Sequence, residues 1–214
     1  MRTIIVGDSF VQHFSETWIE IIAKRFNLDV ALQLGNPGGC EFFTYENFLD
    51  NTKGKDYELA IFTHTEHHRL PNPLKLGITP IMATKNIGKG LPDAIAEASK
   101  AYYEHIYYDR FHKETHDLLI KEMQTICWQR HIKQIHIQSF NTVIPMIHGL
   151  WIVNGLHDLA TLCGENYYLD RTLKNHLNRD LHERFGKWLG DCLEQYLTST
   201  KDLHIQRLDR DYFR

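Results

Sequence analysis

Four short apolar runs alternate with longer segments that have the composition of helices or loops. The runs span residues 3–6, 28–34, 59–63 and 132–138. Between the first two, Phe14, Trp18, Ile21, Ile22 and Phe26 recur at helical spacing. Short apolar runs bounded by turn residues are typical of buried strands, and their alternation with helices indicates βαβ units around a parallel sheet. The sequence therefore predicts an α/β protein with three α/β/α layers and a mostly parallel central sheet.

The segments between and after these runs predict the helices and loops. Helices are expected at residues 12–26, 42–49, 94–130 and 178–197. The segment 94–130 holds neither Gly nor Pro, so it is a helical elaboration made of one very long helix or two in succession. Residues 70–92 form a long connection of the kind that makes lids or substrate walls. Residues 142–163 are ambiguous, and the polar tail 198–214 is expected to pack loosely or contact a partner.

Composition and charge exclude several classes of protein. The chain of 214 residues shows no internal repeat and no linker, so a single domain over residues 1–214 is expected. A net charge of -3 gives no electrostatic case for nucleic acid as a partner. We expect no membrane span and no signal peptide, and therefore a cytoplasmic protein. The four cysteines form no CxxC pair, which predicts reduced, mostly buried thiols, and no cofactor or metal is expected.

The first apolar run ends in Gly7-Asp8-Ser9. A serine at the first turn after a strand presents its hydroxyl at the carboxyl edge of the sheet, where open α/β sheets carry out their chemistry. A serine hydroxyl is a poor nucleophile until a base accepts its proton. The candidate base is His176, near the C-terminus, just before the closing helix.

This pattern resembles the SGNH hydrolases, also called the GDSL esterase/lipase family, over residues 2 to about 197. The family places four short blocks at the carboxyl ends of successive strands, in a sheet of flavodoxin-like order. Residues 4–10 are similar to its first block, which makes Ser9 the nucleophile and its backbone N–H one oxyanion donor. Gly38-Gly39-Cys40 takes the place of the second block. The resemblance assigns the N–H of Gly39 to the oxyanion hole, with Gly38 as the alternative and a plain tight turn as the competing interpretation.

The third block departs from the family pattern, Gly-x-Asn-Asp. Here the chain has Thr63-His64-Thr65-Glu66, so Thr65 stands where an asparagine would donate to the oxyanion. Loss of one such donor typically costs about 2.7–4 kcal/mol in the transition state. Either Thr65 replaces the asparagine, or His64 or His67 supplies the donor, or the activity is low.

The fourth block departs as well, because the position three residues before His176 is Leu173 and not aspartate. Asp170 is our candidate for the acid that orients His176, and Asp158 and Glu66 are alternatives. A Ser–His dyad held by a backbone carbonyl is also chemically sufficient, since the acid only orients the base and stabilises its charge.

The resemblance implies a two-step acyl transfer in which Ser9 attacks an ester carbonyl and His176 moves the proton. The substrate class it implies is a small-molecule or carbohydrate O-acyl ester, such as an O-acetyl sugar. The degenerate third and fourth blocks resemble divergent family members of the kind found in phage genomes. A second hypothesis is a binding or structural protein that keeps the fold without catalysis.

Two further clusters suggest alternatives. His112 and His116 are four residues apart on a predicted helix, and His64, Glu66, His67 and His68 follow the third strand, so a metal-dependent hydrolase is a third hypothesis. The sequence between His112 and His116 does not match HExxH, however. Aromatic residues gather at Tyr102-Tyr103, Tyr107-Tyr108 and Phe111. They predict core or partner packing, with a sugar- or acyl-binding wall as the alternative.

Overall fold

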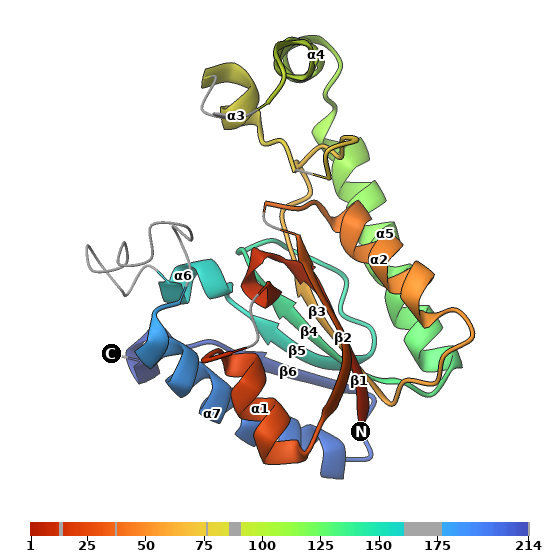
Figure 1. The fold of residues 1–214 in the computed structure, drawn as a ribbon, viewed down its shortest axis with the longest axis vertical. Coiled ribbons are helices and arrows are strands. Elements are labelled where there is room, and N and C mark those ends of the chain that lie inside the picture. Colours follow the sequence, from red (N-terminus) through yellow and green to blue (C-terminus); the bar gives the residue numbers. More distant parts are fainter. Residues whose placement is uncertain (13–14, 37, 76, 86–90, 161–176, 214) are drawn as a thin grey trace.

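A six-stranded parallel sheet forms the centre of the computed structural model (Figure 1). The structure describes residues 1–12, 15–36, 38–75, 77–85, 91–160 and 177–213. The strands are β1 (Arg2–Asp8), β2 (Asp29–Asn36), β3 (Leu59–His64), β4 (Lys133–Gln138), β5 (Gly149–Val153) and β6 (Leu203–Arg207). Their order is β2-β1-β3-β4-β5-β6, and each described pairing is parallel. This confirms the predicted α/β/α class and its flavodoxin-like order.

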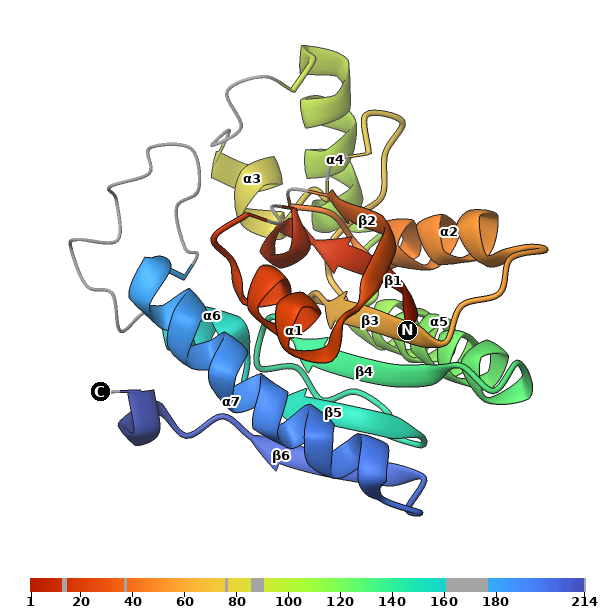
Figure 2. The same cartoon turned by 60° about the horizontal axis from the view of Figure 1, so that its bottom comes forward.

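Helices cover both faces of the sheet, as Figure 2 shows. One face packs against α1 (Trp18–Phe26) and α7 (Arg179–Thr198), and the other packs against α2 (Glu41–Thr52) and α5 (Asp109–Gln129). The strands β1 and β3 are buried on both faces, which explains why they appear in the sequence as nearly continuous apolar runs.

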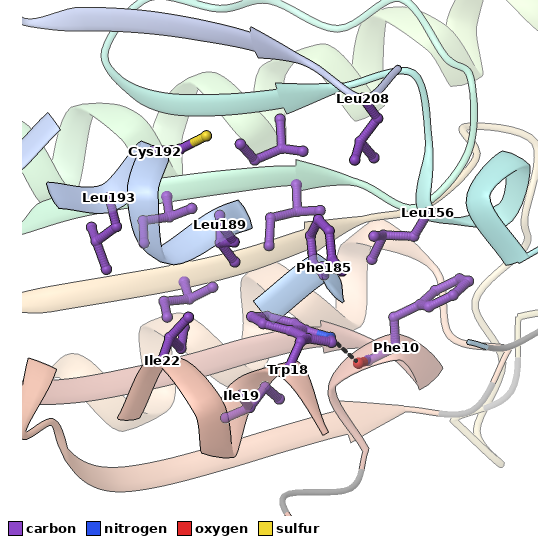
Figure 3. Packing of buried hydrophobic residues seen from close by; sticks show 14 of the residues in the cluster. Phe10, Trp18, Ile19, Ile22, Leu156, Phe185, Leu189, Cys192, Leu193 and Leu208 are labelled. Carbon is purple, nitrogen blue, oxygen red and sulfur yellow. Dashed lines mark hydrogen bonds between the residues drawn. The ribbon is translucent and has the colours of Figure 1, made fainter. Parts of the chain in front are cut away.

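The core on the α1/α7 face is built around aromatic side chains (Figure 3). Trp18 packs edge-on against Phe185 with ring centroids 5.6 Å apart, and both side chains are fully buried. Leu189 and Leu193 extend the apolar stripe along α7. This packing joins the N-terminal and C-terminal parts of the chain, because α1 follows the first strand and α7 precedes the last.

Several element boundaries differ from the sequence prediction. The helix expected at residues 12–26 begins only at Trp18, because Glu16 has a positive φ of 61° and Thr17 is extended. Residues 9–11 instead form a 3-10 turn, η1 (Ser9–Val11). The long segment 94–130 forms two helices in succession, α4 (Asp93–His105) and α5. The ambiguous segment 142–163 contains β5 and the short helix α6 (Leu156–Ala160).

The polar tail was wrongly predicted to pack loosely. Within it, β6 pairs in register with β5 and forms the last strand of the sheet. After β6, Leu208 is buried, as is Phe213 at the end of the 3-10 turn η3 (Arg210–Phe213). The alternating polar residues of β6 fit an edge strand, which is partly exposed to solvent on one side.

The connection that follows β3 rises away from the sheet and carries α3 (Pro80–Lys85) before it reaches α4 (Figure 1). A bridge between Leu70 and Ile78 closes the first part of this connection into a loop. In the part of the chain that the structure describes, no helix is both long and apolar enough to cross a bilayer.

Candidate active site

Ser9 lies at the carboxyl end of the second strand in the sheet order, β1, as the first residue of η1. Its side chain is half-buried, and among the described residues none hydrogen-bonds to its hydroxyl. The turn itself is closed by a hydrogen bond from Gln12 N to Ser9 O of 3.2 Å. The predicted nucleophile therefore lies at the carboxyl edge of the sheet, where open α/β sheets bind their ligands.

The Asp8 side chain holds this turn in place. Asp8 Oδ1 accepts a hydrogen bond from Phe10 N at 3.1 Å, and so caps η1. Burial raises the pKa of the Asp8 carboxyl, against the opposing effects of the nearby Ser139 hydroxyl, of the hydrogen bonds from Phe10 and Thr63 and of the positive charge of Arg69. Asp8 therefore acts as a buried structural acceptor beneath Ser9.

Two glycines allow the backbone to pack closely around this turn. A Cβ on Gly7 would lie 1.9 Å from Thr63 Oγ1 and under 3 Å from the Thr63 backbone. A Cβ on Gly35 would lie 2.6 Å from Gln12 N and 2.8 Å from Asp8 O. These distances leave no room for a Cβ at either position. Steric exclusion therefore explains why the Gly7-Asp8-Ser9 motif begins with glycine.

Phe10, the residue after Ser9, anchors the turn in the core. Its side chain is buried, and its carbonyl accepts a hydrogen bond from Trp18 Nε1 at 3.3 Å (Figure 3). Leu177, at the start of the closing segment, belongs to the same hydrophobic cluster. The predicted base His176 directly precedes Leu177, but His176 and Asp170 both lie outside the described residues, so their roles stay predictions.

The predicted oxyanion donor Gly39 is already bonded within its own turn. Its N–H donates to Asn36 O at 2.8 Å. The alternative, Gly38, has a positive φ of 63°, and a Cβ there would meet no other atom. The Nδ2 of Asn36 is buried without a partner in the described residues, and Asn36 is in register with Asp8 across β1 and β2. An unpaired amide donor thus lies beside the serine turn, which the sequence analysis did not identify.

Thr65, the other predicted oxyanion donor, follows the end of β3. It is 1 % exposed, and its hydroxyl is buried without a hydrogen-bond partner among the described residues. The Thr65 peptide is held from both sides instead. Its N–H donates to Glu41 Oε2 at 3.2 Å, and its carbonyl accepts from His116 Nε2 at 3.0 Å. A donor role for the Thr65 hydroxyl therefore requires a local rearrangement that exposes it.

Glu41, at the first position of α2, begins a chain of buried hydrogen bonds that runs beneath the site. Glu41 Oε1 lies 2.8 Å from His64 Nδ1, His64 Nε2 lies 2.8 Å from His136 Nδ1, and His136 Nε2 lies 2.8 Å from Gln134 Oε1. The amide nitrogen of Gln134 donates to Gln124 O, so its oxygen faces the histidine.

The positions of the protons in this chain can be assigned starting from Gln134, at one end of it. Gln134 Oε1 can only accept, so His136 Nε2 carries a proton. Burial holds the pKa of His136 well below its usual range, so its other nitrogen accepts a hydrogen bond from His64 Nε2–H. At the other end of the chain, His64 Nδ1 faces Glu41 Oε1. Burial raises the pKa of Glu41, but the charges of His64 and His116 and the hydrogen bond from His64 outweigh it, and the net shift is downward.

This chain is packed between aromatic rings. The ring of His136 stacks on Trp151 with a centroid distance of 4.2 Å and on Phe62 with a centroid distance of 4.9 Å. Such stacking fixes the imidazole plane and therefore the direction of its hydrogen bonds. Glu41 and His116 together fix the backbone of Thr65, and the rest of the chain fixes Glu41.

Arg69 lies between the serine turn and the loop after β3. Its guanidinium donates to Glu66 Oε2 at 3.0 Å, contacts Gly39 O at 3.5 Å and faces the Phe140 ring at 4.7 Å from the centroid. Its positive charge also opposes the rise in the Asp8 pKa that burial causes. Arg69 therefore places a positive charge close to the candidate active site, which the sequence analysis did not predict.

The histidines considered as metal ligands have separate partners. His112 Nε2 hydrogen-bonds the Tyr102 hydroxyl at 2.7 Å, whereas His116 Nε2 donates to Thr65 O. Within the described ranges, no group of three or more His, Cys, Asp or Glu side chains is arranged to hold a metal ion.

Cys40, Cys127 and Cys192 are buried free thiols, as predicted, and Cys163 lies outside the described residues.

The chain is similar in fold to solved structures of the family that its sequence resembles. One is a lipolytic protein of the G-D-S-L family from Desulfitobacterium hafniense DCB-2, at 14% identity and a TM-score of 0.49, covering 89% of this chain and 98% of that one. Another is the psychrotrophic esterase EstA from Pseudoalteromonas sp., at 8% identity and a TM-score of 0.35, covering 97% and 76%. A GDSL-like lipase from Bacteroides thetaiotaomicron VPI-5482 has 11% identity and a TM-score of 0.39, covering 96% and 67%.

No family model matches the sequence, and no curated protein matches it. At these identities, and with TM-scores below 0.5, the similar structures carry no argument about this chain. The chemical argument therefore rests on the residues of this chain, above all on Ser9 and its surroundings.

Proposed function

We propose that this protein is a serine ester hydrolase in which Ser9 is the nucleophile. The observation that carries the proposal is the position of Ser9 at the carboxyl end of β1, half-buried, on a turn fixed by the buried carboxylate of Asp8. In this mechanism His176 accepts the Ser9 proton, and the Ser9 oxygen attacks the ester carbonyl. His176 then protonates the leaving alcohol, and water repeats the sequence to release the acid.

Donors for the oxyanion come from three places in this proposal. The backbone N–H of Ser9 is one donor, and the positive charge of Arg69 lies close by. The unpaired Nδ2 of Asn36 is a third group beside the turn. Neither predicted donor can act without a local change. Gly39 N–H would have to break its hydrogen bond to Asn36 O, and the buried Thr65 hydroxyl would have to become exposed.

A second candidate function is a binding protein that keeps this fold without catalysis. The observation in its favour is that neither Gly39 nor Thr65 presents a free donor at the site. The half-buried hydroxyl of Ser9, which has no hydrogen-bond partner among the described residues, favours the hydrolase instead, because a structural serine in a tight turn usually bonds the nearby backbone.

Hydrolysis of p-nitrophenyl acetate separates these two functions. We expect turnover by the wild type, and loss to background in Ser9→Ala and His176→Ala. The matched control is Ser199→Ala, which changes a serine that caps the far end of α7 and should leave the rate unchanged. A wild type that does not exceed Ser9→Ala, with all variants folded by circular dichroism, would favour the binding protein.

A further inference from the structure

A cavity of about 600 Å³ shares Arg69 with the candidate active site: Arg69 lines the cavity, and its guanidinium contacts Gly39 O at 3.5 Å. Its walls come from the start of α2, from α4, from the first half of α5 and from residues 66–73 after β3. Figure 1 shows α4 set apart from the sheet, above α2 and α5. Two lining residues, Cys40 and Glu66, directly follow the predicted oxyanion donors Gly39 and Thr65 in the chain.

The walls of this cavity are mainly apolar. Representative lining side chains are Phe42, Leu70, Ile95, Ala98, Phe111 and Leu119. Phe42 is 43% exposed and Phe111 is 59% exposed, so aromatic side chains lie between the cavity and solvent. An apolar surface of this kind gains free energy when an apolar group replaces water against it.

Polar groups in the lining are largely engaged by other protein groups. The Tyr102 hydroxyl bonds His112, Arg69 pairs with Glu66, and His116 Nε2 donates to the Thr65 carbonyl. They therefore offer few free hydrogen bonds to the hydroxyl groups of a sugar. Among the described lining residues, buried nitrogens without a partner are Nδ1 of His67 and Nδ1 of His116.

We propose that this cavity binds the apolar acyl chain of an ester substrate, with a length of about six carbons or more. This inference rests on the proposed ester hydrolase and names its substrate class. At roughly 30 Å³ for a water-sized group, an acetyl group would leave most of the cavity unfilled, and even a chain of about eight carbons fills less than half of it. The substrate is accordingly an acyl ester with a chain much longer than acetyl, and an O-acetyl sugar fits these walls poorly.

Arg69 marks the boundary between the two parts of this site. It lines the cavity, and its guanidinium also contacts Gly39 O and influences Asp8 beside the nucleophile. An ester bound with its chain in the cavity would pass its carbonyl by Arg69 toward Ser9. The Glu66–Arg69 pair, with an N–O distance of 3.0 Å, keeps the Arg69 charge in that position.

The activity test compares p-nitrophenyl acetate, hexanoate and octanoate. Each methylene buried in the cavity is worth about fourfold in binding, so we expect kcat/KM to be at least about tenfold higher for octanoate than for acetate. Ala98→Trp fills the cavity from α4 and should remove this preference. Ala101→Trp is the matched control, because Ala101 is exposed on the same helix and does not line the cavity. Ala94→Trp is the second cavity variant, should Ala98→Trp fail to fold.

A binding test does not depend on catalysis. Octanamide, which is neutral and not an ester, is titrated calorimetrically into Ser9→Ala protein with and without Ala98→Trp. Binding that Ala98→Trp abolishes supports the cavity proposal even if no esterase activity exists, in which case only the proposed hydrolase fails. Esterase activity without any chain-length preference, together with octanamide that does not bind, overturns the cavity proposal and leaves the hydrolase standing.

Discussion

The hydroxyl of Thr63 makes two hydrogen bonds with Asp8. It accepts a hydrogen bond from Asp8 N at 3.1 Å and donates one to Asp8 Oδ1 at 3.0 Å, while both side chains are buried. The same Asp8 oxygen caps the turn that carries Ser9. Thr63 on β3 therefore fixes, through Asp8, the turn after β1 that carries Ser9, the proposed nucleophile.

Thr63→Val tests this relationship, because valine keeps the shape of threonine and removes both hydrogen bonds. Leaving the buried Asp8 amide unpaired, and Asp8 Oδ1 with the hydrogen bond from Phe10 but without the one from Thr63, should lower the free energy of unfolding by about 1–3 kcal/mol. The looser turn should also lower kcat for a p-nitrophenyl ester. Thr63→Ser is the control that keeps the hydroxyl. If Thr63→Val matches Thr63→Ser in both denaturant midpoint and kcat, Thr63 does not position the turn.

Gly7→Ala should be more damaging than an ordinary glycine substitution. Its new Cβ would clash with the Thr63 backbone as well as with its hydroxyl, and backbone atoms in a central strand cannot move away cheaply. Gly186→Ala is the comparison, since the three atoms nearest to a Cβ there belong to the Ile21 side chain, at 2.9–3.1 Å, and not to a backbone. We expect a loss of about 3 kcal/mol or more for Gly7→Ala, measured by urea unfolding, and a smaller loss for Gly186→Ala. Equal losses would contradict the close approach.

The buried imidazole of His136 should make stability depend on pH. Because burial lowers its pKa in the folded state, the unfolded chain takes up a proton below about pH 6.5 that the folded chain does not. Stability is therefore full above that pH and falls as the pH drops, by up to about 1.4 kcal/mol per pH unit. In His136→Gln this slope, measured by urea unfolding between pH 7 and 5, should be shallower, although the variant is less stable at pH 7. An unchanged slope would show that His136 is not the titrating group.

Arg69→Gln removes the positive charge beside the serine turn and keeps a side chain that can still contact Glu66 and Gly39. If that charge stabilises the oxyanion, kcat should fall about tenfold or more with a smaller change in KM. Arg69→Lys keeps the charge and should retain more activity than Arg69→Gln. A change confined to KM would assign Arg69 to substrate binding alone.

Much of the fold could be predicted because its strands are buried on both faces. Runs such as those of β1 and β3 are apolar throughout, which distinguishes them from the surrounding helices. The edge strand β6 could not be predicted in this way, since Ile205 is 47% exposed and its neighbours are polar. The predicted start of α1 was also wrong, because Glu16, which has a left-handed backbone conformation, interrupts a sequence that has helical spacing.

The candidate site could be predicted only where its residues follow a strand directly. Ser9 was found from the turn after β1, and Thr65 from the end of β3. The network of Glu41, His64 and His136 could not be found, because these residues are far apart in the chain and meet only when α2 packs over β3 and β4. A histidine between two isoleucines of a buried strand, as at His136, was the one local signal of a buried polar chain.

The most direct test of the account is covalent labelling of the intact protein with a fluorophosphonate ester, followed by mass spectrometry of the peptides. The Ser9 oxygen should bond to phosphorus as fluoride leaves, because an activated serine is the nucleophile that such reagents select. We predict one adduct, located on Ser9, which is absent in Ser9→Ala and unaffected in Ser199→Ala. An adduct on another residue, or none on a folded wild type, would contradict the assignment of Ser9 as the nucleophile.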